Sequence, residues 1–480
     1  MRNLLLDRIL KRYCEKQNFL DPYASKKADS HLKRNIKGII KDLSLTGNYS
    51  VTETYIYERV EKIRKYILQK EELAKIPHVK QKSPEWFARR AGRISASDFG
   101  AALGLGMSSN SQKEFFKKKC GYEEIEFNDF ALSIMARGNK YEDVAAMLYE
   151  YRSGIKITEF GLLPHPTDDR FGASPDGITE YGQCIEIKCP AKKKIDGKAP
   201  QYYYFQMQGQ MAVCGLDETD FIQCNFYDYR DYDEYDNDWD DTNILSKDYK
   251  EKGLIIEYDA SSEYNQDEIV QYWIYSPIGI TKQELNEFRD DTIIDLIEQK
   301  NLDMNNIRVG YWRLDQMLIQ RLYRDDTFIN SMFSDLDSIY NKIQYYKQNP
   351  ESYYKDIGRP SNKNNISEIR CLKKMKINDN ISSVTSPSIT PQEPPKIELT
   401  EEEKKLDLYG TINIGINYES DMEGYADNYK TDSKIKTIKL PSQEKILREK
   451  QEKKEAKERF LEEKQKEKEQ LNNYIFQDIM

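Results

Sequence analysis

The amino-acid sequence predicts an α/β protein, because strand and helix patterns alternate within its most ordered stretch, residues 83–228. Apolar and charged residues alternate over residues 184–189, which is typical of a strand. Segments 136–154 and 201–215 instead have the periodicity of helices. Strands and helices mixed in this way predict a core domain built from a sheet with helices packed on it.

The chain is expected to contain four regions. Helical periodicity, as in residues 55–76, predicts a helical lobe at the N-terminus, and Asn, Ser, Thr and Pro become frequent after residue 357. The predicted regions are a helical lobe (1–80), a core domain with C-terminal additions (81–350), a linker (351–400) and a charged, partly disordered helical tail (401–480).

The additions to the core domain begin with an acidic stretch. Residues 228–242 hold eight acids and one arginine, which predicts a solvated loop or insertion, with cation binding as the less favoured alternative. Strands are then predicted at 253–259 and 269–277, and a helix at 281–301. These elements either complete the core domain or form an appendage to it.

Composition limits the classes of protein that fit. The chain has 480 residues and a net charge of -9, so it is no bulk polycation, although acidic enzymes still bind DNA through a local groove. Seven Cys without C-x-x-C spacing predict a reduced, intracellular protein, and argue against a disulfide framework, a zinc finger or an iron–sulfur site. Three His disfavour His-based metal or triad chemistry, and the absence of an apolar run near 18 residues argues against a membrane partner.

Asp176, Glu186 and Lys188 form the strongest candidate site. Pro175, Asp176 and Gly177 predict a tight turn, and a hairpin would bring Asp176 beside Glu186 on the following strand. Two converging carboxylates favour a hard cation such as Mg²⁺. Lys188 shares a strand face with Glu186 and could orient a water or stabilise charge on phosphorus. A charged outer strand face is the alternative interpretation of the same pattern.

A second candidate site precedes the hairpin. Ser95 and Ser97 stand at a predicted helix start with Arg90 nearby, which would suit a phosphate, although helix capping explains the serines equally well. Glu142 lies near the start of the 136–154 helix, where an exposed acid is also favoured by the helix dipole.

A third pattern lies on the 201–215 helix. Gln206 and Gln210 are four residues apart there, and Gln208 is on another face. A glutamine that faces a core needs a polar partner, such as a metal-bound water or a phosphate.

Five ordered blocks resemble the λ-exonuclease-like nucleases, also called YqaJ-type viral recombinases, of the PD-(D/E)xK superfamily. Looser similarity extends to Cas4-like and RecB-type nucleases. The blocks are EWFARRAGRISAS (85–97), RGNKYED (137–143), GASPDGI (172–178), IEIKCP (185–190) and YYFQMQGQMAV (203–213). The resemblance implies a restriction-endonuclease-like core, in which helices flank a central mixed sheet.

The resemblance also implies a role for each matching residue. Lys188 would be the catalytic lysine, and Gln208 would touch the active-site water or metal shell. The implied metal ligands are Asp176, Glu186, the carbonyl of Ile187 and Glu142, and the implied 5′-phosphate ligands are Arg90, Ser95 and Ser97.

The implied activity is hydrolysis of DNA by two Mg²⁺ or Mn²⁺ ions, as a 5′–3′ exonuclease that resects duplex ends. A Cas4-like endonuclease acting on foreign or replicating DNA and a non-catalytic DNA-binding scaffold are the alternatives. Double-stranded DNA is the expected partner, with an annealing protein or helicase on the C-terminal tail.

The family's ring-shaped assemblies suggest a homo-oligomer, a dimer or a trimer, although the additional lobes could block a ring and leave a dimer or a monomer. The composition suggests a large DNA virus, and hence the host cytoplasm. Lysine clusters at 115–121 and 188–198 could neutralise DNA phosphates, or could be solvated loop lysines.

Overall fold

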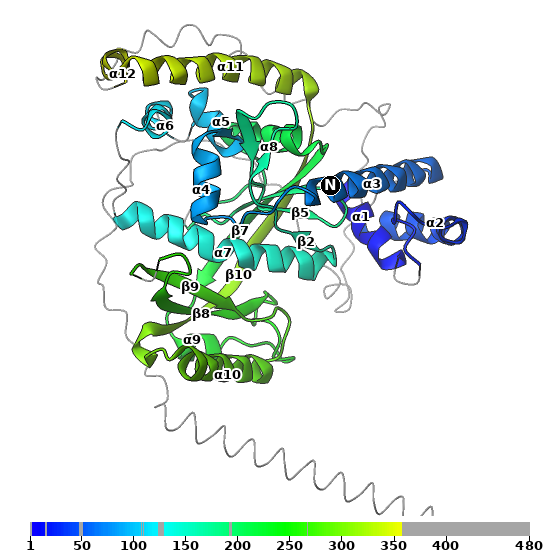
Figure 1. Ribbon diagram of the computed structural model, residues 1–480. Coiled ribbons are helices and arrows are strands. Elements are labelled where there is room, and N and C mark those ends of the chain that lie inside the picture. The colour runs from blue at the N-terminus through cyan, green and yellow to red at the C-terminus, as the bar shows by residue number, and fades with distance from the viewer. Residues whose placement is uncertain are drawn as a thin grey trace, which may run out of the picture. The chain divides into compact units, whose positions relative to one another are not determined.

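The computed structural model (Figure 1) describes residues 2–14, 17–47, 51–106, 108, 110–122, 129–191, 194–265 and 267–357. The chain divides into two compact units. Within the described residues, unit 1 comprises the chain up to Phe226 and again from Asp315 to residue 357, and unit 2 comprises Tyr227–Leu314. The predicted C-terminal tail and the linker beyond residue 357 lie outside the described residues. Helix α12 (Pro350–Asp356) occupies the beginning of the predicted linker.

Unit 1 contains a mixed sheet, as the sequence predicts. The central strand β6 pairs antiparallel with β5 and parallel with β7. A second, small sheet has the order β1 (Ile94–Ser95), β4 (Phe171–Ala173) and β3 (Leu163–Pro164). The strands of the main sheet in spatial order are β2 (Ile157–Thr158), β5 (Gly177–Thr179), β6 (Cys184–Lys188), β7 (Glu218–Asp228) and β10 (Ile307–Tyr323).

Helices cover both faces of this sheet, which confirms the predicted fold class. Neighbouring residues of β7 face opposite ways: Asp220 receives a hydrogen bond from Tyr149 of α7, while Phe221 packs against Tyr203 of α8. Figure 1 shows α7 and α8 on opposite sides of the strands accordingly. The remaining helices of unit 1 outside the N-terminal lobe are α4 (Pro84–Ala91), α5 (Ala96–Ala102), α6 (Ser111–Cys120), α7 (Asp129–Ser153), α8 (Gln201–Cys214) and α11 (Asp326–Gln348).

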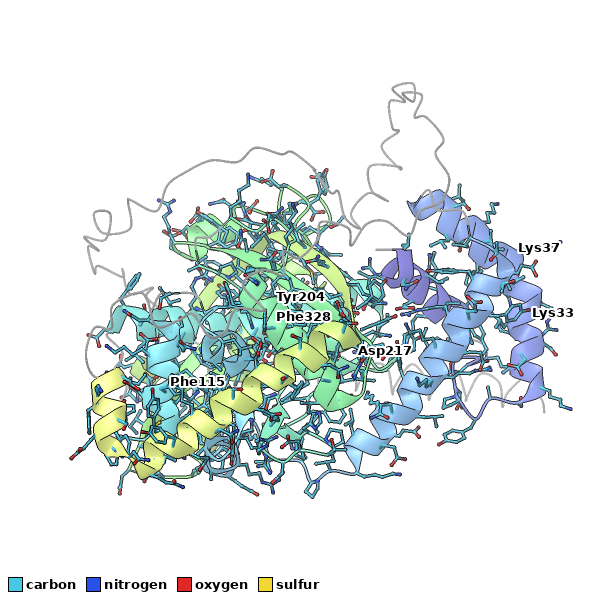
Figure 2. All side chains as sticks on the ribbon, turned by 90° about the horizontal axis from the view of Figure 1, so that it is seen from above. Lys33, Lys37, Phe115, Tyr204, Asp217 and Phe328 are labelled. Carbon is cyan, nitrogen blue, oxygen red and sulfur yellow. The ribbon has the colours of Figure 1, made fainter. Side chains whose placement is uncertain are left out.

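The core of unit 1 is rich in aromatic rings. Phe328 of α11 packs edge-on against Tyr204 and Phe205 of α8, with ring centroids 5.0 and 4.7 Å apart. Figure 2 shows Tyr204 and Phe328 together where α11 crosses α8. Gly209 of α8 lies where a Cβ atom would be 2.5 Å from the ring of Phe99, so a glycine is needed for α5 to approach α8. This close packing fixes α8 on the sheet.

The N-terminal lobe is helical, as predicted. It consists of α1 (Arg2–Tyr13), α2 (Lys26–Gly47) and α3 (Glu53–Ala74). Thr52 caps α3 by accepting a hydrogen bond from the Tyr55 backbone N–H at 3.2 Å. The apolar face of α3 is buried, as its sequence periodicity indicates.

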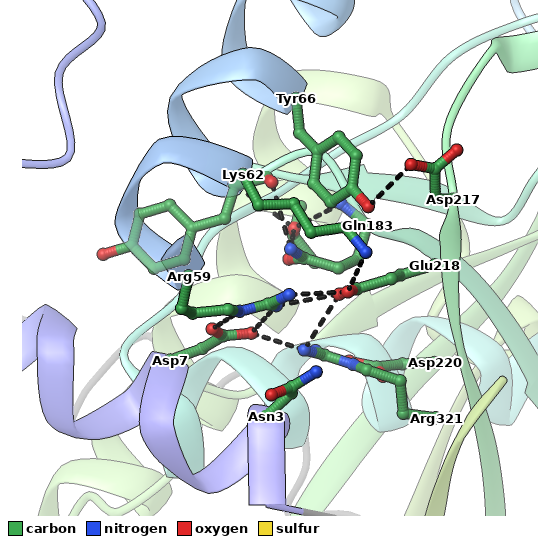
Figure 3. Close-up of polar contacts among 12 residues, drawn as sticks. Asn3, Asp7, Arg59, Lys62, Tyr66, Gln183, Asp217, Glu218, Asp220 and Arg321 are labelled. Atoms are coloured by element: carbon green, nitrogen blue, oxygen red, sulfur yellow. Dashed lines mark hydrogen bonds and ion pairs between the residues drawn. The ribbon is translucent and has the colours of Figure 1, made fainter. Parts of the chain in front are cut away.

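A buried ion-pair network joins this lobe to the main sheet (Figure 3). Arg59 of α3 binds Asp7 of α1 at 2.7 and 2.6 Å, and Glu218 of β7 at 2.5 and 2.8 Å. Arg321 of β10 binds Asp220 through two parallel hydrogen bonds of 2.7 and 2.8 Å, and also contacts Asp7 and Glu218. Every guanidinium in this network therefore meets carboxylates on more than one element, which holds the lobe against the sheet.

Unit 2 is a small α/β unit of its own. Its strands are β8 (Lys252–Ser261), β9 (Ile269–Tyr275) and the first half of β10, and β8 is antiparallel to both neighbours. The elements that precede and follow these strands are α9 (Tyr232–Asp236), α10 (Lys282–Lys300) and the 3-10 turn Met304–Asn306. The predicted strands and the predicted 281–301 helix thus form.

The acidic stretch 228–242 is more than the solvated loop that its charge predicts. It contains α9, and its interleaved rings Tyr229, Tyr235 and Trp239 are buried in the core of unit 2. Lys252 lies 4.0 and 4.1 Å from the ring centroids of Tyr235 and Trp239, and burial lowers its pKa to about 7. Aromatic residues, which the charge count ignores, decide how this segment packs.

Among the helices of the described ranges, none has a stretch both apolar and long enough to cross a membrane.

Candidate active site

The hairpin of β5 and β6 brings Asp176 beside Glu186, as predicted. Gly177 faces Ile185 in the strand register, and the Asp176 backbone N–H donates to the Ile185 carbonyl at 3.1 Å. The Asp176 carboxylate then accepts a hydrogen bond of 2.6 Å from the Ile187 backbone N–H. Asp176 is therefore fixed across the strand that carries Glu186 and Lys188.

Glu186 is fully buried and every oxygen of its carboxylate has a partner. Gln206 and Gln210 of α8 donate side-chain N–H groups to Oε1 and Oε2, each at 2.7 Å. The Lys188 ammonium also binds Oε1. Three donors thus hold one buried carboxylate in a single orientation.

Lys188 lies between this carboxylate and the backbone. Its Nζ atom donates to the Ile187 carbonyl at 2.9 Å and lies 5.1 Å from the ring centroid of Tyr203. Burial alone would lower the pKa of Lys188, but the charges of Glu186 and Asp176 outweigh it and raise that pKa. Lys188 is therefore held as an ammonium in this arrangement.

The remaining carboxylates repel one another. Burial and then the charges of Glu142 and Glu186 raise the pKa of Asp176 well above its usual value. Burial also raises the pKa of Glu142, which lies on α7, although Lys188 and Lys82 oppose the rise. Glu142, Asp176 and Glu186, called here the site carboxylates, thus face a single internal ammonium, Lys188, and their repulsion favours an added cation.

The donor types fit a hard divalent cation. Asp176, Glu186, Glu142 and the Ile187 carbonyl offer the oxygen ligands that Mg²⁺ and Mn²⁺ prefer, and the buried Gln210 Oε1 has no hydrogen-bond partner in the described part of the chain. As these side chains stand, no three His, Cys, Asp or Glu residues of the described ranges are grouped closely enough to hold an ion. Instead, the Lys188 ammonium binds the Ile187 carbonyl and the Glu186 carboxylate, which are two of the predicted metal ligands. The donor types therefore fit a hard divalent cation, although in this arrangement the side chains do not converge on one point.

The residues predicted to hold a 5′-phosphate are brought together at the start of α5. Arg90 donates to the Ser97 hydroxyl, and the Ser95 and Ser97 hydroxyl oxygens are 3.4 Å apart. The Arg90 guanidinium also stacks 4.7 Å from the ring centroid of Trp86, which restricts its position. Ser95 makes no capping hydrogen bond with its side chain, so the capping alternative does not explain it.

Asp98 belongs to the same cluster, although the sequence did not single it out as a site residue. It accepts a hydrogen bond of 2.8 Å from Ser95 and forms ion pairs of 3.2 and 3.1 Å with Lys118 and Lys119 of α6. Burial would raise the pKa of Asp98, but these lysines and Arg90 outweigh it and lower the pKa. Three cations against one acid leave this cluster net positive, as an anion site requires.

Residues 85–217 match the YqaJ-like viral recombinase domain. The resemblance seen in the five sequence blocks is therefore confirmed for these residues, which contain both clusters.

The chain is also similar to a viral protein and to two solved structures. Over 323 residues the chain is 27% identical to an uncharacterised protein of Acanthamoeba polyphaga mimivirus, a match that covers 59% of this chain and 56% of that protein. The chain thus spans about half the length of this relative. An alkaline exonuclease from Laribacter hongkongensis is 21% identical with a TM-score of 0.33, covering 56% of this chain and 97% of that one. A phage-related exonuclease from Haemophilus somnus is 15% identical with a TM-score of 0.28, covering 54% and 96%.

Within the YqaJ-like domain, one predicted residue lies away from the carboxylates. Gln208 donates to the Tyr323 carbonyl at 2.8 Å and accepts from the Asp325 backbone N–H at 2.9 Å, so it ties α8 to the end of β10. Gln206 and Gln210 contact Glu186 instead. Their spacing of four residues was the signal that could have identified them, because both then lie on one helix face.

Proposed function

We propose that this chain is a metal-dependent DNA nuclease of the λ-exonuclease and YqaJ type, which removes nucleotides from duplex ends in the 5′–3′ direction. The observation that carries the proposal is the buried Glu186 carboxylate, fixed by two glutamines and Lys188 beside two further carboxylates. The match of residues 85–217 to the YqaJ-like domain supports DNA as the substrate.

Lys188 has a hydrogen left for the reaction. An ammonium has three N–H groups, and two of them are directed to Glu186 and Ile187. The third can donate to an attacking water or to a phosphate oxygen, where it stabilises charge that develops on phosphorus. Gln206 and Gln210 keep the Glu186 carboxylate oriented while this happens.

The site carboxylates and the Ile187 carbonyl would hold the divalent cations, Mg²⁺ or Mn²⁺, two in each site. Bound there, such ions supply Lewis-acid stabilisation of the phosphate and an activated water. The Arg90, Ser95 and Ser97 cluster would hold the 5′-phosphate, and so set the register of the DNA end.

Digestion of three DNA substrates tests the proposal. We would compare linear duplex with 5′-phosphates, linear duplex without them and closed circles, with Mg²⁺ or Mn²⁺ and with EDTA. The Lys188→Met variant should lose about 10²–10³-fold in cleavage rate, because it removes the charge near the phosphate while keeping the length of the side chain. Lys75→Met is the matched control, since Lys75 is exposed and pairs only with Glu72 one turn earlier.

Each outcome has a distinct meaning. Preference for phosphorylated linear duplex, lost in Lys188→Met and in EDTA, is the expected result. Nicking of closed circles would replace the exonuclease by the Cas4-like endonuclease alternative. Binding of DNA without cleavage under any condition would favour the scaffold alternative.

Three further expectations stay predictions. They are the dimeric or trimeric state, an annealing or helicase partner on the tail, and action in a reducing compartment, in the host cytoplasm if the chain is viral. The last rests on the sequence alone, whose seven Cys lack C-x-x-C spacing.

A further inference from the structure

Helix α2 of the N-terminal lobe has one buried and one exposed face. Its apolar residues recur every three or four positions and are buried in the lobe, so the opposite face is presented to solvent. The buried residues are Ala28, Leu32, Ile36, Ile39 and Leu43. The orientation of α2 is therefore fixed by packing.

The exposed face is strongly basic. Figure 2 shows Lys33 and Lys37 on the outer side of the helical lobe. We call the basic face the set Lys26, Lys27, Lys33, Arg34, Lys37 and Lys41, all of them exposed. Within the described ranges, none of these six side chains forms an ion pair or a hydrogen bond. Both acids of α2 are engaged elsewhere: Asp29 binds Arg64 at 2.7 Å and Asp42 accepts from Tyr13 at 3.2 Å.

Helix α3 shows that this charge is particular to α2. Both helices have 22 residues, but α3 carries five acids and five bases whereas α2 carries two acids and six bases. Some exposed bases elsewhere in unit 1 are paired, as Arg89 is with Glu85 and Lys156 with Glu150. An unpaired basic helix face in a chain of net charge -9 marks a surface for an anionic partner.

We propose that the basic face of α2 binds the phosphate backbone of duplex DNA, outside the YqaJ-like domain. The choice of DNA as the anion rests on the proposed nuclease function. The row from Lys26 to Lys41 is about 22 Å long at ~1.5 Å per residue. With phosphates about 3.4 Å apart along each strand, that row can lie along several successive phosphates.

The composition of the face favours DNA over an acidic protein. Protein interfaces are depleted in lysine and depend on buried aromatic anchors, and the basic face contains five lysines and no aromatic ring. Phosphate contacts, in contrast, are made largely by lysine and arginine and carry no sequence information. The surface would hold the duplex to the enzyme without selecting its sequence.

The test is DNA binding as a function of salt. The full chain with Lys33→Gln, Arg34→Gln, Lys37→Gln and Lys41→Gln is titrated with a fluorescent blunt duplex in EDTA, from 50 to 200 mM salt. Each lost phosphate contact lowers the slope of log K against log salt by about 0.9, so we expect the slope to fall by about 3 to 4. The control variant removes the same charge from exposed lysines outside α2, with Lys65, Lys75, Lys156 and Lys247 each changed to Gln.

A second readout separates this surface from the active site. At saturating DNA and low salt, the α2 variant should cleave at the wild-type rate, because none of its residues belongs to the catalytic cluster. An unchanged salt slope, or an equal loss in the control variant, would overturn the proposal. Polyglutamate is the second competitor. If it binds the wild-type chain as tightly as DNA does and displaces the DNA, the proposal is overturned in favour of an acidic protein partner. α2-dependent binding in a chain that cleaves no DNA would support the surface while the nuclease proposal fails.

Discussion

Unit 1 buries two clusters of charge, and they are built in opposite ways. In the ion-pair network, Asp7, Glu218 and Asp220 face the two guanidinium groups of Arg59 and Arg321, with Lys62 3.4 Å from Glu218. Three acids therefore meet three bases. In the candidate active site, three carboxylates meet one buried ammonium of the described residues, and burial together with repulsion raises the pKa of Glu142 and Asp176.

The contrast separates a structural cluster from the candidate active site. The network is complete as it stands, since its carboxylates and guanidinium groups satisfy one another. Within the described residues Lys188 offsets only part of the charge of the site carboxylates, so a bound proton or a bound cation would relieve their repulsion. Charge imbalance, and not burial alone, distinguishes the two.

The largest expected effect comes from removing one charge from each cluster. Arg321→Met leaves Asp220 and Asp7 buried with fewer partners and should lower the free energy of unfolding by about 3–5 kcal/mol. Asp176→Asn instead removes repulsion and keeps the acceptor for the Ile187 N–H, so the metal-free variant should unfold at the same temperature or higher while cleavage is lost. Thermal unfolding of both variants in EDTA measures this difference. A comparable loss of stability in Asp176→Asn would mean that the site carboxylates are not in repulsion.

A smaller effect is expected from two glutamines that share α8. Gln210→Leu removes one of the donors that orient Glu186 and should lower the cleavage rate about 10–100-fold, as the loss of a supporting hydrogen bond does at metal sites. Gln208→Leu removes the link between α8 and β10 and should cost about 1–3 kcal/mol of stability with little change in rate per folded molecule. Cleavage rate and urea unfolding are measured for both variants. If Gln208 were the catalytic residue, Gln208→Leu would lower the cleavage rate more than Gln210→Leu does.

The smallest expected effect is on the pH dependence of the free energy of unfolding in acid. Burial would raise the pKa of Glu218, but Arg59 and Arg321 outweigh it and lower the pKa from 4.5 to about 2. A lowered pKa means that the stabilisation is present above pH 4.5 and is lost as the pH falls through about 2. Between these limits the wild type should lose up to about 1.4 kcal/mol per pH unit more than Glu218→Gln. Unfolding midpoints in urea at pH 6, 4 and 3 check this, and parallel pH curves for the two proteins would contradict it.

Local patterns in the sequence predicted the fold and the heart of the site. Asp176, Glu186 and Lys188 lie within thirteen residues on one hairpin, so turn chemistry and strand alternation suffice to bring them together. The helix α8 was predicted with its ends, but which glutamines face Glu186 was not, because almost every residue from Tyr204 to Cys214 is buried. The four-residue spacing of Gln206 and Gln210 places both on one face, but in a helix that is buried all round this spacing does not show which face turns toward Glu186.

Contacts between distant segments could not be predicted. Asp98 meets lysines that are 20 and 21 positions away on another helix, and Asp7 meets Arg321 across 314 positions. Neither pairing leaves a periodic signal in one sequence. The prediction of a solvated loop for the acidic stretch 228–242 was wrong for a different reason. Its charge suggested exposure to solvent, whereas Tyr229, Tyr235 and Trp239 pack around Lys252.

The pairing of Asp7 with Arg321 has a consequence for the order of events at the ribosome. Translation at roughly 5–20 residues per second means that Asp7 emerges about 15–60 s before the arginine that completes its surroundings. During that interval Arg59 is the base already made that binds Asp7 directly. The surroundings of Asp7 can therefore be completed only after β10 has been made, when residues 227–314 of unit 2 have already been synthesised.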